Sequence, residues 1–92
     1  MTSSSGDVPE VDLHGRRPAD AERYAALQLH AARVRGDRRV VIVTGRGWGN
    51  AQREPVLRTR IERWLAGTEA RRLGVRGFRR VAKGGALEVD LL

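Results

Sequence analysis

The sequence predicts a two-layer α/β sandwich with the element order βαβαββ, in which two helices pack on a four-stranded mixed sheet. Three observations support this class. A continuous β-branched run at residues 40–43 is typical of a buried strand. Helical apolar periods lie on both sides of that run, and two further strand patterns follow residue 74. The 92 residues are expected to form a single domain over residues 9–92, behind a disordered serine-rich tail at residues 1–8.

The first strand pattern begins at Val11 and ends beside a candidate site. Alternation along an extended strand sends Val11 and Leu13 to the face that packs on the core. Asp12 and His14 then lie side by side on the other face. The second strand is expected over residues 39–43, after a helical crossover that makes the two strands parallel. Their carboxyl ends therefore meet at one edge of the sheet, where open α/β sheets bind ligands.

The crossover helix is expected to begin near Pro18, which suits a first helical turn, and to stop at Gly36. One apolar stripe of this helix should face the sheet. Its members recur at three, four and three residues: Tyr24, Leu27, Ala31 and Val34. His30 falls off this stripe and is expected at the surface.

The second half of the chain predicts one helix and two strands. The helix should open at Pro55 and close at Gly67, with a buried stripe of Leu57, Ile61, Trp64 and Leu65. A third strand is expected over residues 75–81, with Phe78 in the core. A turn at Gly84-Gly85 then joins it to a final strand over residues 86–91, which makes the last two strands antiparallel.

Charge and composition restrict the function. The net charge is +7, from seventeen arginines and one lysine against eleven acids. Residues 1–45 carry a net charge of +1 and residues 46–92 carry +6, and a basic half is typical of a polyanion binder. The alternative is a set of solvated arginine faces. The chain has no cysteine, which excludes disulfides and thiolate chemistry. Without a signal peptide or an apolar run of membrane-spanning length, a cytoplasmic protein with no membrane partner is expected.

Asp12 and His14 together have the chemistry to cleave phosphodiesters. A carboxylate can hold a divalent cation such as magnesium or manganese, or it can orient a base. An imidazole moves protons near neutral pH. The alternative interpretation of the pair is a polar strand end with no catalytic role.

A glycine loop follows the second strand and suits a phosphate. Gly45 and Gly47 would offer backbone N–H groups, and Arg46 a charged contact. Trp48, between two glycines, is expected to expose an indole that stacks on an unpaired base. The lysine of a Walker loop is missing, which argues against a nucleotide cofactor. The alternative is a plain strand-to-helix connection. The remaining candidates for contact with nucleic acid are Thr44, Arg58, Arg63 and Lys83.

Two motifs resemble a known family. Residues 11–15 read Val-Asp-Leu-His-Gly and resemble the LDLHG motif of the Smr domain, the small MutS-related module. Residues 44–47 read Thr-Gly-Arg-Gly and resemble its second motif, (T/H)GxG. The resemblance covers about residues 11–92. It implies an α/β sandwich and a nucleic-acid function, described for members as DNA nicking or RNA cleavage, with ribosome-associated roles for some.

The resemblance also implies site roles. Asp12 and His14 would be the catalytic pair, and residues 45–47 would bind the scissile phosphate. The chain departs from the family at Thr44, where many active members have histidine, and at Gly84-Gly85, where a longer glycine-rich turn is common. We therefore expect a monomeric module that binds nucleic acid and cleaves it weakly, alone or in a ribosome or repair complex. The alternatives are a non-catalytic module for structured RNA or branched DNA and, third, a small nucleotide-binding protein.

Overall fold

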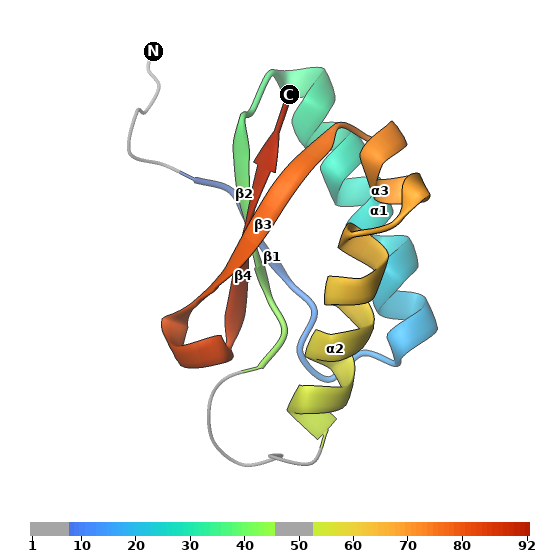
Figure 1. Ribbon diagram of the computed structural model, residues 1–92, viewed down its shortest axis with the longest axis vertical. Coiled ribbons are helices and arrows are strands. Elements are labelled where there is room, and N and C mark those ends of the chain that lie inside the picture. The colour runs from blue at the N-terminus through green and yellow to red at the C-terminus, as the bar shows by residue number, and fades with distance from the viewer. Residues whose placement is uncertain (1–7, 46–52) are drawn as a thin grey trace.

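The structure is a computed structural model and describes residues 8–45 and 53–92. Its elements, in chain order, are β1 (Glu10–Asp12), α1 (Pro18–Arg35), β2 (Arg39–Val43), α2 (Arg53–Leu65), α3 (Thr68–Arg72), β3 (Val75–Val81), the 3₁₀ helix η1 (Ala82–Gly84) and β4 (Ala86–Leu91). The helices lie together on one face of the sheet (Figure 1). The predicted two-layer fold with a four-stranded mixed sheet is confirmed.

The sheet brings one edge of the molecule together from distant parts of the chain. Its strand order is β1-β2-β4-β3, with β1 parallel to β2 and β4 antiparallel to both of its neighbours. Val43 at the end of β2 pairs with Asp12 of β1 and with Ala86 of β4, and Ala86 pairs with Val81 at the end of β3. The carboxyl ends of β1 and β2 therefore meet the β3–β4 turn, at the lower edge of the sheet in Figure 1.

The structure contains a third α-helix that the sequence did not predict. Helix α2 begins at Arg53, two residues before the expected Pro55, and ends at Leu65. Gly67 then precedes the five-residue helix α3 instead of closing α2. Five residues are too few to show an apolar period, and only Ala70 of α3 is buried. The expectation of two helices was therefore wrong by one short helix.

The inner face of α1 is also different from the predicted one. The buried residues of α1 are Ala21, Ala25, Leu29 and Ala32. Two members of the predicted stripe point outward instead, with Leu27 67% exposed and Val34 74% exposed. The other two, Tyr24 and Ala31, are half-buried, and Tyr24 packs against the core. Alanines on the inner face let the helix approach the sheet closely, where the larger strand side chains fill the space between the layers. The predicted helix boundaries are confirmed, and Gly36 ends α1 with a left-handed φ of 88°.

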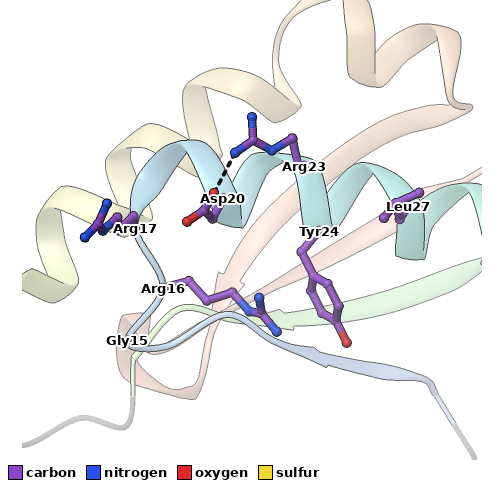
Figure 2. A pocket seen from close by; sticks show the side chains of 7 residues that line it. All are labelled: Gly15, Arg16, Arg17, Asp20, Arg23, Tyr24 and Leu27. Atoms are coloured by element: carbon purple, nitrogen blue, oxygen red, sulfur yellow. Dashed lines mark hydrogen bonds and ion pairs between the residues drawn. The ribbon is translucent and has the colours of Figure 1, made fainter.

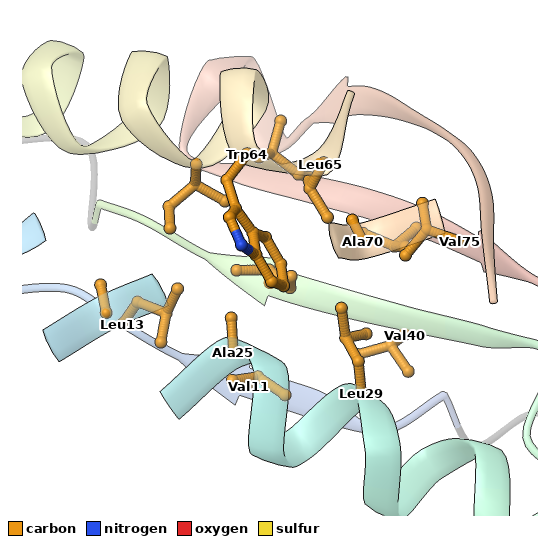
Figure 3. Packing of buried hydrophobic residues seen from close by; sticks show 14 of the residues in the cluster. Val11, Leu13, Ala25, Leu29, Val40, Trp64, Leu65, Ala70 and Val75 are labelled. Atoms are coloured by element: carbon orange, nitrogen blue, oxygen red, sulfur yellow. The ribbon is translucent and has the colours of Figure 1, made fainter. Parts of the chain in front are cut away.

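The core lies between the helical layer and the sheet (Figure 3). Its largest fully buried side chains include Leu13, Leu29, Ile42, Ile61 and Leu87. The predicted stripe of α2 is confirmed, because its four members are between 0% and 8% exposed: Leu57, Ile61, Trp64 and Leu65. Phe78 is half-buried and packs against this core from β3. None of the described helices has the length and hydrophobicity needed to cross a membrane.

Ion pairs tie the sheet to the helices and its strands to one another. Arg80 of β3 donates two hydrogen bonds to Glu62 of α2, at 2.6 and 3.1 Å, and these bonds lower the pKa of the Glu62 carboxyl below its ordinary value of 4.5. On the face of the sheet away from the helices, Arg39 of β2 pairs with Asp90 of β4 at 3.2 Å. Glu88, also of β4, pairs with Arg79 of β3.

Candidate functional site

The Asp12–His14 pair is formed by the end of β1 and the turn that follows it. The backbone N–H of Leu13 donates to the carbonyl of Val43 at 2.7 Å, which extends the parallel pairing one residue beyond the strand. Leu13 is fully buried, so the residues on either side of it face away from the core. Gly15 has a φ of 81°, a conformation that L side chains rarely adopt, and it turns the chain toward α1.

The geometry of the pair indicates which nitrogen of its imidazole carries a proton. Nδ1 of His14 lies 2.6 Å from Oδ1 of Asp12, and the backbone N–H of His14 donates to the same oxygen at 3.1 Å. An ionised carboxylate only accepts hydrogen bonds, so Nδ1 must carry the proton. The neutral ring then has its lone pair on Nε2. The side chains are 50% exposed for His14 and 36% for Asp12, so a ligand at this edge can reach the ring.

The described residues do not form a metal site of their own. No group of three or more His, Asp or Glu side chains within residues 8–45 and 53–92 could surround an ion. Oδ1 of Asp12 already accepts two hydrogen bonds from His14. Magnesium is usually held by one or two carboxylates together with substrate phosphates. The donor set therefore does not fit a metal held by these residues alone.

A second cluster at this edge is closed by backbone hydrogen bonds. The N–H groups of Thr44 and Gly45 both donate to the carbonyl of Gly85, at 2.9 and 3.1 Å. A Cβ on Gly85 would lie 2.9 Å from the carbonyl oxygen of Gly45, so this approach requires glycine. Nη1 of Arg58 donates to the carbonyl of Gly84 at 3.1 Å and anchors the turn to α2. We call Thr44, Gly45, Gly84, Gly85 and Arg58 the glycine junction.

The glycine junction changes two expectations about phosphate binding. The N–H of Gly45 is already bonded to Gly85, so it is not available as a phosphate donor in this arrangement. The Thr44 side chain is 2% exposed, and its hydroxyl has no hydrogen-bond partner among the described residues. Both residues therefore shape the start of the loop and do not present a polar group to a ligand.

The other residues predicted to contact nucleic acid lie at different places in the structure. Arg58 is half-buried, and its guanidinium donates to the carbonyl of Gly84. Arg63 is exposed near the end of α2, about 15 Å along the helix from its first residue, and lies apart from the Asp12–His14 pair. Lys83 lies in η1, next to the glycine junction. Arg46, Gly47 and Trp48 lie outside the described residues.

Sequence reasoning missed the structural role of Arg58 and Gly85. Arg58 meets Gly84 across 26 residues of chain, and no local pattern signals such a contact. For Gly85 the adjacent glycines were a usable signal, because paired glycines often mark a close backbone approach as well as a turn.

Comparison with known proteins gives a consistent result. The family model of the Smr domain matches residues 11–91 of the chain. The crystal structure of the Smr domain of Thermus thermophilus MutS2 is similar, with 29% sequence identity and a TM-score of 0.72 over 92% of this chain and 99% of that one. Among curated protein sequences, none matches the chain significantly.

Two further structures share the fold. YdaL, a stand-alone small MutS-related protein from Escherichia coli, is 22% identical with a TM-score of 0.68, over 95% of this chain and 69% of that one. The SMR domain of NEDD4-binding protein 2 is 21% identical with a TM-score of 0.66, over all of this chain and 94% of that one. At these identities the likeness concerns the fold alone.

Proposed function

Because the chain belongs to the Smr domain family, we propose that it binds nucleic acid and hydrolyses phosphodiesters weakly, as a DNA-nicking or an RNA endonuclease. The observation that carries this proposal is the Asp12–His14 pair, with its 2.6 Å contact between Nδ1 and Oδ1 at an exposed edge of the sheet. The net charge of +7 supports a polyanionic substrate.

In this proposal His14 is the general base. Its Nε2 takes a proton from the attacking oxygen, a water or a ribose hydroxyl, as that oxygen bonds to phosphorus and the bond to the leaving oxygen breaks. Asp12 holds the ring by Nδ1 and stabilises the imidazolium that forms. Arg46 and the amide of Gly47 are proposed to stabilise the charge that develops on the phosphoryl oxygens.

Weak activity follows from the single imidazole. In an in-line displacement the attacking and leaving oxygens lie on opposite sides of phosphorus. One ring cannot serve both sides in the same step, so the leaving oxygen must take its proton from solvent. Thr44 stands where many active family members have a histidine, and its side chain is buried. A single general base contributes about 10²–10⁴-fold to the rate.

The test is a cleavage assay on supercoiled plasmid and on a structured RNA, with magnesium, manganese or a chelator. His14→Ala should lower the cleavage rate by about 10²–10⁴-fold, and Asp12→Asn should also lower it, because an amide no longer fixes the tautomer. His30→Ala is the matched control, since it removes an exposed imidazole from the middle of α1. Undiminished cleavage by both site variants would contradict the proposal, and the chelator lanes decide whether a divalent cation takes part.

The second candidate function is a binding module without catalysis. Thr44 favours this second function. It is buried and is not a histidine, so the two motifs together offer a ligand one imidazole, that of His14. The second function predicts salt-sensitive binding to structured RNA or branched DNA that survives both site variants, with no cleavage by the parent. A gel shift run beside the cleavage assay separates the two functions. A cytoplasmic location, a monomeric state and a ribosome or repair complex as a larger partner stay predictions.

A further inference from the structure

An open groove begins beside the Asp12–His14 pair and follows the start of α1 (Figure 2). It has a volume of about 510 Å³ and begins at Gly15, the residue that follows His14. Its lining includes Arg16, Arg17 and Arg23, with a single acid, Asp20. Asp20 pairs with Arg23 at 2.6 Å, so the lining keeps an excess of positive charge. An open groove lined by arginines suits a polyanionic strand.

The groove contains a stacked pair of side chains. The guanidinium carbon of Arg16 lies 3.9 Å from the centroid of the Tyr24 ring, within the range of a cation–π contact. Figure 2 shows both side chains reaching past α1 on the side of β1, so that they meet beneath the helix. Tyr24 also packs against the core, which holds its ring in place. The contact thus presents a flat cation at a fixed position.

A planar guanidinium has two faces, and Tyr24 covers one of them. Nucleobases stack on arginine planes as they do on aromatic rings. The stack consequently offers a platform for one unpaired base. Arg17 lines the same groove at the start of α1, is exposed, and is suited to a backbone phosphate. Leu27 lies about one turn of α1 beyond Tyr24 and is 67% exposed, and it extends the apolar part of the groove.

We infer that this groove is a subsite for an unpaired nucleotide next to the scissile phosphate, with the base stacked on Arg16 and the phosphate on Arg17. The inference rests on the proposed nucleic-acid function and deepens it. It assigns the protein a preference for substrates with a loop, bulge or frayed end over continuous duplex. A duplex keeps its bases in the stack and has none to place on Arg16.

The test uses a fluorescein-labelled hairpin with one bulged nucleotide and the same hairpin with an abasic site at the bulge, with fluorescence anisotropy as the readout. Arg16→Lys keeps the charge and loses the plane, so it should weaken binding of the bulged probe by about 10-fold and leave binding of the abasic probe unchanged. Arg38→Ala is the control for loss of one exposed charge, placed at the start of β2 at the opposite edge of the sheet.

A salt titration tests the phosphate contact. Arg17→Ala should reduce the slope of log affinity against log salt by about 0.7–0.9, and Arg38→Ala should leave the slope unchanged. If Arg16→Lys weakens the two probes equally, or neither of them, the subsite is overturned while the proposed function stands. If the parent binds neither probe, the proposed function fails and the subsite fails with it. Circular dichroism confirms that each variant is folded.

Discussion

The Asp12–His14 pair and the glycine junction stand at the same edge of the sheet, and they differ in what they show to a ligand. His14 is 50% exposed and its ring is oriented by one carboxylate. The glycine junction buries Thr44 and uses the amides of Thr44 and Gly45 to bind the β3–β4 turn. Both segments carried motifs that resemble one family site. One motif can therefore present reactive atoms while its neighbour serves mainly to hold the β3–β4 turn.

This contrast predicts opposite effects of mutation in the two regions. Variants of His14 should change cleavage and leave the free energy of unfolding within about 0.5 kcal/mol of the parent, because exposed side chains contribute little to stability. Variants of the glycine junction should first lower stability.

The largest stability effect is expected for Gly85→Ala. The new Cβ would lie 2.9 Å from the Gly45 oxygen and 3.3 Å from the Ala82 oxygen, and both are backbone atoms. We expect a loss of about 1–3 kcal/mol in the free energy of unfolding, measured by urea denaturation. Gly77→Ala is the control, because a Cβ there meets nothing within 4 Å. Equal stability of the two variants would show that the backbone of the glycine junction moves to accept the new Cβ at no cost in free energy.

A smaller effect is expected for Arg58→Met. This change keeps an unbranched, apolar stem but removes the donor to the Gly84 carbonyl. The loss of a half-buried, charge-assisted hydrogen bond should cost about 1–2 kcal/mol. It should also speed amide exchange in η1 and at Gly85, measured by NMR. Arg63→Met, on an exposed position of the same helix, should stay within about 0.5 kcal/mol of the parent. A similar loss in both variants would remove the anchoring role from Arg58.

Thr44→Val should be neutral or stabilising by up to about 1 kcal/mol, because it replaces a buried hydroxyl that lacks a partner among the described residues with a methyl group of similar size. Thermal unfolding measures the effect. Destabilisation by more than about 1 kcal/mol would mean that the hydroxyl is hydrogen-bonded in solution.

The smallest effect lies outside both regions, at Glu62. Its pKa in the folded protein is lowered by the hydrogen bond from Arg80, so this contribution to stability is present above about pH 4.5 and is lost as the pH falls through the folded pKa. Because the Arg80 side chain is 58% exposed, the contribution should stay below about 1 kcal/mol. Glu62→Gln should flatten the acid side of the stability profile, measured by urea unfolding at a series of pH values. An unchanged slope would assign the acid dependence to other carboxyls.

The sequence predicted the strands better than the helices, for a physical reason. The continuous run in β2 and the alternation in β4 each fit one period only, so Arg39–Val43 and Ala86–Leu91 were placed correctly. Helix α1 has apolar residues on both its inner and its outer side. The prediction placed the larger side chains, Leu27 and Val34, on the inner face. Close packing of the helix on the sheet instead places small alanines there.

The candidate site was predictable only as far as local geometry reaches. Asp12 and His14 are two residues apart, so their contact follows from the strand and its turn. The hydrogen bond from the Gly45 amide to Gly85 and the one from Arg58 to Gly84 both depend on how β4 and α2 pack at this edge. Those contacts join segments that no spacing rule relates.

The ion pairs on the open face of the sheet bear on how the protein meets a polyanion in solution. Arg39 and Arg79 are neutralised there by Asp90 and Glu88. Arg17, at the start of α1, has no acidic partner within the part of the chain that the structure describes. If the proposed nucleic-acid function holds, this exposed charge adds to the attraction of a diffusing polyanion toward the start of α1. Added salt should slow association more than it speeds dissociation, because this steering acts over a Debye length.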